Sequence, residues 1–121
     1  MKGILITTKN KMTVHDFPDN VPLYKATGDV IGGFEIVHPV NLPSPYCMIV
    51  DDEGLLKNLP RNAVGCGLYG TKEHGSPIVG DIVLLKDVMT SSGPDIGYLN
   101  DEDVKRLTSY ISRASGGKVR L

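Results

Sequence analysis

The stretch VDDEGLLKNLPRN, residues 50–62, places three adjacent carboxylates before a glycine. A calcium loop needs oxygen ligands at alternate positions over about twelve residues. The acids here are consecutive, and consecutive side chains of an extended strand point to opposite faces, so Asp51 and Asp52 would not converge on an ion. The apolar residues on both sides favour a hairpin turn at Asp52-Glu53-Gly54, with a positive φ at the glycine. We therefore expect a turn and no metal site.

The step Leu59-Pro60-Arg61-Asn62 follows this turn directly. Pro60 fixes its own φ and forces the residue before it to be extended, so Arg61 and Asn62 are expected on a stiff bend. A preorganised side chain loses less entropy when it binds a ligand. The alternative is that Asn62 caps a short helical turn that begins at Ala63. The sequence leaves both roles open.

The segment GCGLYG, residues 65–70, has the GxGxxG spacing of a dinucleotide-binding turn. That turn must lead into a helix, and the following TKEHGSP cannot form one of useful length. Small residues still allow backbone N–H groups to approach a phosphate, with Lys72 nearby and Tyr69 able to stack on a base. The alternative is a flexible or bulged connection with one core tyrosine. The candidate ligand-binding residues are Arg61, Asn62, Gly67, Tyr69, Gly70 and Lys72.

No motif for catalysis is recognisable in the sequence. The three histidines lie in separate regions without ligand spacing, so we expect neither zinc nor another cofactor. The first candidates for an acid–base pair are His74 with Asp81 or with Asp51. A binding protein is expected rather than an enzyme.

Composition narrows the class of protein further. The 121 residues suit one domain, and 13 Lys and Arg against 14 Asp and Glu give a net charge of -1. This balance favours neither duplex DNA binding nor mimicry of DNA. No apolar run approaches the roughly 20 residues of a membrane span, and the N-terminal run is too short for a signal peptide. Cys47 and Cys66 lack CxxC spacing and are expected to be reduced. We therefore expect a cytoplasmic protein.

Apolar patterning and turn residues predict five strands and two helices. The predicted strands span residues 2–8, 12–17, 34–37, 46–50 and 82–85. The first helix is expected over residues 21–27, capped by Asn20 and ended by Gly28. The second is expected over residues 99–112, capped by Asn100, with acids 101–103 beside the positive end of its dipole. Residues 39–45 and 87–98 are expected to be loops.

These elements predict an α+β fold in a single domain, residues 1–115, with a flexible C-terminal tail, residues 116–121. The sheet is expected to be small and mostly antiparallel, with about five strands, because most connections are too short for crossovers. One short helix and the C-terminal helix should cover one face. The other face, or the loop ends, would then be available to a partner or ligand.

Five segments taken in order, GILITTKNKMTVHDF, GGFEIV, MIVDDEGLLKNLPRN, GSPIVGDIVLL and LNDEDV, resemble a family of small phage and mobile-element proteins catalogued as domain of unknown function 3846. The specific features are the D-E-G turn followed by L-P-x-N, and V-G-D before an apolar strand. The chain departs from the family pattern by a longer proline loop, residues 39–45, and by the inserted TKEHGSP. The resemblance implies no activity, but it implies an accessory protein of a phage or mobile element in an infected bacterium.

Such accessory proteins often look like counter-defence factors. The leading hypothesis is a protein that binds and sequesters a nucleotide-derived immune signal, a cyclic dinucleotide or an ADP-ribose derivative, without cleaving it. Arg61 and Lys72 would pair with phosphate, Asn62 would read a base edge or ribose, and Tyr69 would stack. A homo-oligomer is expected because a small domain encloses a ligand better at a subunit interface.

Two other functions remain open at this point. The first is a protein-binding inhibitor of a host defence or nucleic-acid enzyme, acting through one exposed sheet face or edge strand. The second is an enzyme that cleaves the same nucleotides.

Overall fold

The computed structural model describes the backbone of residues 1–121 and every side chain except that of His74. Six strands form one sheet in the order β2-β1-β5-β4-β3, and β6 pairs with β5. All the described strand pairs are antiparallel. The strands are β1 (Lys2–Ile6), β2 (Met12–Asp16), β3 (Glu35–Val37), β4 (Tyr46–Val50), β5 (Ile82–Thr90) and β6 (Gly93–Gly97), and the helices are α1 (Leu23–Ile31), α2 (Ala63–Tyr69), α3 (Thr71–His74) and α4 (Asp101–Ala114). The predicted α+β class, with a C-terminal helix on an antiparallel sheet, is confirmed.

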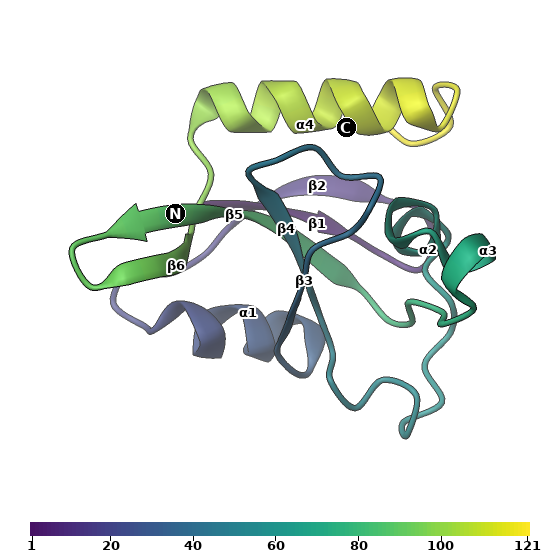
Figure 1. Cartoon of the computed structure of the whole chain (residues 1–121), viewed down its shortest axis with the longest axis horizontal. Helices are drawn as coiled ribbons and strands as arrows, with labels where there is room; N and C mark the ends of the chain where they lie inside the picture. The colour runs from purple at the N-terminus through teal and green to yellow at the C-terminus, as the bar shows by residue number, and fades with distance from the viewer.

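Both faces of the sheet are covered, whereas the sequence predicted helices on one face only. Met48 and Leu84 belong to a cluster that includes residues of α2 and α4. Their neighbours Ile49 and Val83 belong to a second cluster that includes residues of α1. In Figure 1, α4 lies above the sheet and α1 below it. Strands β4 and β5 are apolar on both faces, and burying both requires a helix on each side.

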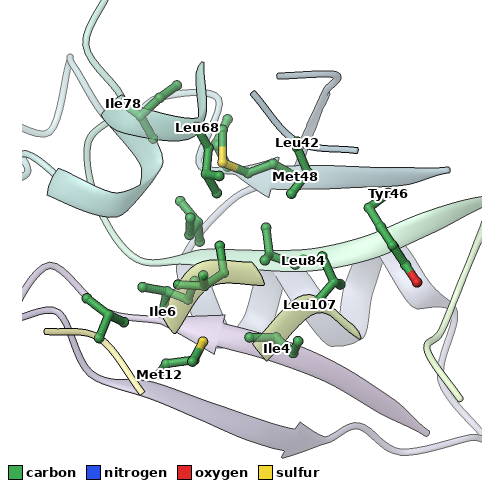
Figure 2. Packing of buried hydrophobic residues seen from close by; sticks show 14 of the residues in the cluster. Ile4, Ile6, Met12, Leu42, Tyr46, Met48, Leu68, Ile78, Leu84 and Leu107 are labelled. Carbon is green, nitrogen blue, oxygen red and sulfur yellow. The ribbon is translucent and has the colours of Figure 1, made fainter. Parts of the chain in front are cut away.

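The larger cluster joins the sheet to α2 and α4. Figure 2 shows Leu68 of α2 and Leu107 of α4 packed around Met48 and Leu84 of the sheet. Leu107 is fully buried. This packing fixes the positions of α2 and α4 on this face of the sheet, and so determines the space between the two helices.

Helix α1 differs from its predicted boundaries at both ends. Its N-cap is Pro22, with no side-chain cap, so Asn20 does not have the predicted capping role. The helix continues through Gly28 and ends at Gly32, whose φ is 100° and whose N–H donates to the Gly28 carbonyl. The continuation buries Ile31 against the sheet, and this packing outweighs the weak helix propensity of Gly28.

Residues 87–98 were predicted to form a loop, and most of them instead belong to the β5–β6 hairpin. Its pairs run from Lys86 opposite Gly97 to Thr90 opposite Gly93. The hairpin extends past the rest of the sheet, so its side chains show little of the apolar alternation that identifies a core strand (Figure 1). The sequence pattern therefore missed this strand pair.

Helix α4 follows its predicted cap. The Asn100 side chain accepts a hydrogen bond from the Asp103 amide at 2.8 Å, and the Asp103 side chain bonds the Asn100 amide in return. Beyond the helix, the Val119 amide donates to Ser115 Oγ at 3.0 Å, and the Val119 side chain is buried in the larger cluster. The chain thus turns back toward α4 after the helix ends. Within the part of the chain described, no helix has the length and apolar character to cross a membrane.

Candidate functional site

The acidic stretch after β4 forms a turn but not a hairpin. Residues 52–58 make consecutive turns, and the next element is helix α2, so the turn does not lead directly into a strand paired with β4. The left-handed residue is Asn58, with φ 55°, whereas Gly54 does not have a positive φ. The Asp51 side chain stabilises the start of these turns, because its Oδ1 accepts a hydrogen bond from the Glu53 amide at 2.9 Å.

The Asp51 carboxylate is neutralised inside the protein. Its side chain is 1% exposed and lies 2.8 Å from Lys57 Nζ, which also donates to the Gly32 carbonyl at 3.0 Å. Burial opposes ionisation, but the hydrogen bonds from Lys57 and the Glu53 amide outweigh it and hold the pKa of Asp51 below its usual value. Asp52 Oδ1 accepts from the Phe34 amide. Among the described side chains, no group of three His, Cys, Asp or Glu gathers to hold a metal ion.

Asn62 has the capping role that the sequence offered as an alternative. The side chain is fully buried, and its Oδ1 accepts a hydrogen bond from the Gly65 amide at 2.9 Å. Its Nδ2 donates to the carbonyls of Ile6 and Gly80, each at 3.0 Å. These bonds tie the start of α2 to β1 and to the segment before β5. Arg61 beside it is exposed, and its backbone forms a bridge with Val79.

The glycines of residues 65–70 lie in or at the end of α2, not in a flexible connection. Gly65 packs so closely on Ile78 that a Cβ would lie 2.7 Å from that side chain. Gly67 faces the other way, with no atom within 4 Å of the position of a Cβ. Gly70, with φ 82°, ends the helix. Helix α3 has only four residues, so the dinucleotide-binding turn remains excluded.

The structure divides the predicted ligand residues between different sides of α2. Gly67 lines a cavity between α2 and α4, which we call the α2–α4 cavity. Tyr69 lines another cavity, beside β3, which we call the β3-edge cavity. Arg61 and Lys72 are exposed and line neither cavity. The predicted residues therefore do not form one site.

The α2–α4 cavity has a volume of about 500 Å³. Its apolar wall comes mainly from α2 and α4, and its polar lining residues are Asn10, Asn41, Tyr110, Ser115 and Lys118. Lys118 is the cation among the described lining residues, which include no carboxylate. The cavity therefore suits a partly apolar ligand that carries negative charge.

Hydrogen bonds at Asn41 hold one side of this cavity. The Asn41 amide donates to the Leu68 carbonyl at 2.9 Å, and Nδ2 donates to the Gly67 carbonyl at 2.9 Å. The Tyr110 hydroxyl donates to the Asn41 carbonyl. Asn41 thus links α2 to α4 across the proline loop, and these bonds hold one wall of the cavity in place.

Sequence reasoning missed the polar residues of this cavity. Asn10 lies in the turn after β1, Asn41 in the proline loop and Lys118 in the tail, so no local spacing connects them. One signal was present in the sequence: Gly116-Gly117. Both glycines have a positive φ, and such a pair indicates that the chain can reverse and bring Lys118 back toward α4.

The β3-edge cavity has the opposite electrostatic character. Its volume is about 460 Å³, and its lining includes the carboxylates of Glu35, Asp51 and Asp52. Apolar residues of the turn, Leu55 and Leu56, complete one side. None of the described residues that line it is cationic. Phosphate would be repelled there.

Both acid–base pairs considered from the sequence include His74, whose side chain lies outside the described residues. Asp81 accepts a hydrogen bond from the Thr8 amide at 3.0 Å, and Asp51 is paired with Lys57.

Both cysteines are free thiols, as expected. Burial, with the charge of Asp87 as a smaller cause, raises the pKa of Cys47 to about 12. Its thiol therefore stays protonated and unreactive at neutral pH.

Comparison with known proteins identifies a family. A family model described as Domain of unknown function (DUF3846) matches residues 1–112. None of the curated proteins and none of the solved structures matches the chain.

Proposed function

We propose that this chain, which belongs to the family described as Domain of unknown function (DUF3846), binds and sequesters a nucleotide-derived ligand in the α2–α4 cavity. The observation that carries the proposal is this cavity of about 500 Å³, open at Gly67. Pockets for small molecules typically have volumes of about 300–1,000 Å³ and mostly apolar walls. The cavity meets both conditions.

The lining supports a ligand with an apolar ring and an anionic group. Val64, Leu68 and Ile111 offer an apolar surface for a base. The side chains of Asn10 and Asn41 can hydrogen-bond the edge of a base or a ribose. The Lys118 ammonium can form charge-assisted hydrogen bonds with phosphate.

The difference in charge between the two cavities favours this location. A phosphate near Tyr69 would approach Glu35 and Asp52 in the β3-edge cavity, where Asp51 is already paired with Lys57. Gly67 is therefore the residue of the sequence-based site that the proposal retains, and Lys118 takes the role first considered for Arg61 and Lys72.

Binding without cleavage is part of the proposal. The described lining of the α2–α4 cavity includes no carboxylate, histidine or cysteine that would serve as a general base or nucleophile. The counter-defence role rests on the phage or mobile-element origin that the family resemblance implies. With that origin, the ligand would be an immune signal in the cytoplasm of an infected bacterium, and a homo-oligomer would enclose it more completely.

Native mass spectrometry of the protein purified from bacterial cells, followed by denaturing release, tests the function. A nucleotide-like mass at fixed stoichiometry is expected. Protein found empty would be titrated with cyclic dinucleotides and ADP-ribose by calorimetry. Absence of binding in both experiments would contradict the function.

The variant Gly67→Leu tests the location. The new side chain would enter the open space of the cavity, and the folded state should persist because leucine is the better helix former. Affinity is expected to fall by about a hundredfold or more, as a ligand and a leucine would compete for one volume. The matched control is Gly28→Ala in α1, on the opposite face, where the nearest atom to a Cβ is 3.6 Å away. Unchanged affinity in Gly67→Leu would place the ligand elsewhere.

A further inference from the structure

We propose that the free edge of β3, together with the turn at residues 51–58, is a docking surface for an extended cationic segment of a partner protein. This surface, which we call the β3-edge surface, is separate from the α2–α4 cavity. The inference does not depend on the identity of a nucleotide ligand.

Strand β3 lies at an edge of the sheet. It pairs with β4 through Glu35, Ile36 and Val37, and no other strand in the described part of the chain pairs with its outer side. Backbone groups on such an edge can bond an added strand. The short length of β3 limits the added pairing to a few residues, so side-chain contacts must supply much of the affinity.

The turn beside this edge displays two consecutive leucines. Leu55 is 64% exposed and Leu56 is 84% exposed. Ile36 on β3 is also exposed, at 39%. Scattered exposed leucines are common, but these two are adjacent and line the β3-edge cavity beside the open edge, where they offer an apolar contact surface.

The leucines are held outward by a bonded turn. The Lys57 amide donates to the Glu53 carbonyl at 3.0 Å, and the Leu59 amide donates to the Gly54 carbonyl at 3.1 Å. The Asp51–Lys57 ion pair fixes the start of the turn to its end. Because the turn is ordered before binding, little conformational entropy would be lost on docking.

The charge of the surface identifies the occupant. Lys57 neutralises Asp51, which leaves Glu35 and Asp52 as the charged groups of the β3-edge cavity. A partner segment with lysine or arginine between apolar residues would place cations at these carboxylates and apolar side chains on the leucines. A second copy of the chain is disfavoured, because an isologous contact would bring two acidic surfaces together.

A short synthetic peptide of alternating lysine and valine is the first probe, and a peptide of alternating glutamate and valine is its charge control. Amide chemical shifts of the isotope-labelled protein would report binding. Saturable shifts are expected at residues 35–37 and 52–57 with the lysine peptide alone. Shifts elsewhere, or equal binding of the two peptides, would overturn the proposal.

The double variant Leu55→Ser/Leu56→Ser tests the surface directly. Both side chains are exposed, so the fold should be retained, and affinity for the lysine peptide is expected to fall by about tenfold. The matched control is Met89→Ser in the β5–β6 hairpin, where the side chain is 78% exposed and lies on β5, which β4 separates from β3. Unchanged affinity in the double variant would contradict the assignment.

Two further measurements distinguish the β3-edge surface from the α2–α4 cavity and from a self-association interface. Gly67→Leu should bind the lysine peptide as the wild type does, because the α2–α4 cavity is not involved. Sedimentation over a range of concentrations would detect self-association. A dimer that the double serine variant abolishes would assign the surface to a second copy and overturn the proposal.

Discussion

Two stretches of the chain contain three acids each, and they are used differently. In residues 50–58, the buried carboxylate is Asp51, and its partners Glu53 and Lys57 lie within six positions. In residues 100–106, the buried carboxylate is Asp103, and its partners include Lys86 of β5 and Tyr46 of β4. One acid organises a turn, whereas the other attaches a helix to the sheet.

The cations of the two pairs also differ in their access to water. Lys57 is 41% exposed, whereas Lys86 is 21% exposed. A lysine that loses its counter-charge is less destabilising when it can rotate into solvent. Asp51 and Asp103 are therefore expected to contribute differently to stability, although the sequences around them are similar in composition.

The largest expected effect is that of Asp103→Asn. The substitution would leave Lys86 without its counter-charge beside the core and would weaken the bond from the Tyr46 hydroxyl. We expect a loss of about 3–5 kcal/mol in the free energy of unfolding, measured by urea denaturation. The control is Asp101→Asn on the same helix, where the carboxylate is 87% exposed and should matter little. Equal losses in the two variants would contradict the docking role of Asp103.

Asp51→Asn is expected to have a smaller effect, about 1–3 kcal/mol. The variant keeps an acceptor for the Glu53 amide but loses the ion pair, and Lys57 can extend into water. Hydrogen exchange should accelerate at residues 53–59 and stay unchanged in α4. A loss of stability as large as that of Asp103→Asn, with faster hydrogen exchange over the whole chain, would contradict the difference between the two stretches.

The smallest expected effect is on the way the free energy of unfolding changes with acidic pH. Burial of Asp103 opposes ionisation, but bonds from Lys86, the Asn100 amide and Tyr46 outweigh it and lower its pKa, as for Asp51. A lowered folded-state pKa stabilises the protein above the unfolded value of about 3.9, and this contribution is lost as the pH falls through the folded-state pKa.

In each asparagine variant, the free energy of unfolding should therefore depend less steeply on acidic pH than in the wild type, by up to about 1.4 kcal/mol per pH unit. Urea midpoints at a series of acidic pH values would measure this slope. Profiles parallel to that of the wild type would show that the substituted carboxyl does not contribute.

Local signals in the sequence predicted the elements whose causes are local. The cap at Asn100 depends on residues three positions apart, and the apolar runs of β4 and β5 follow from burial on two faces. The β5–β6 hairpin was missed because its exposed strands show little alternation. Helix α1 was ended too early at Gly28 because the gain from burying Ile31 is a tertiary contact.

The candidate site was predicted less well than the fold. Asn62 was recognised as either a binding residue or a cap, and only its contacts with Ile6 and Gly80 distinguish the two. Gly67 was predicted to let a ligand approach the backbone, and it lies in α2 facing open space, but the α2–α4 cavity that it lines also involves Asn41 and Lys118. No spacing rule connects positions so far apart in the chain.

By itself, the sequence determined an antiparallel α+β domain, its main strands and the capped C-terminal helix, because these follow from periodicity and from interactions between near neighbours. The tertiary structure alone decided which acid of each stretch is buried, which side of α2 each glycine faces, and how charge is divided between the two cavities. These features depend on packing between distant segments, where a side chain's environment is set by its partners in space.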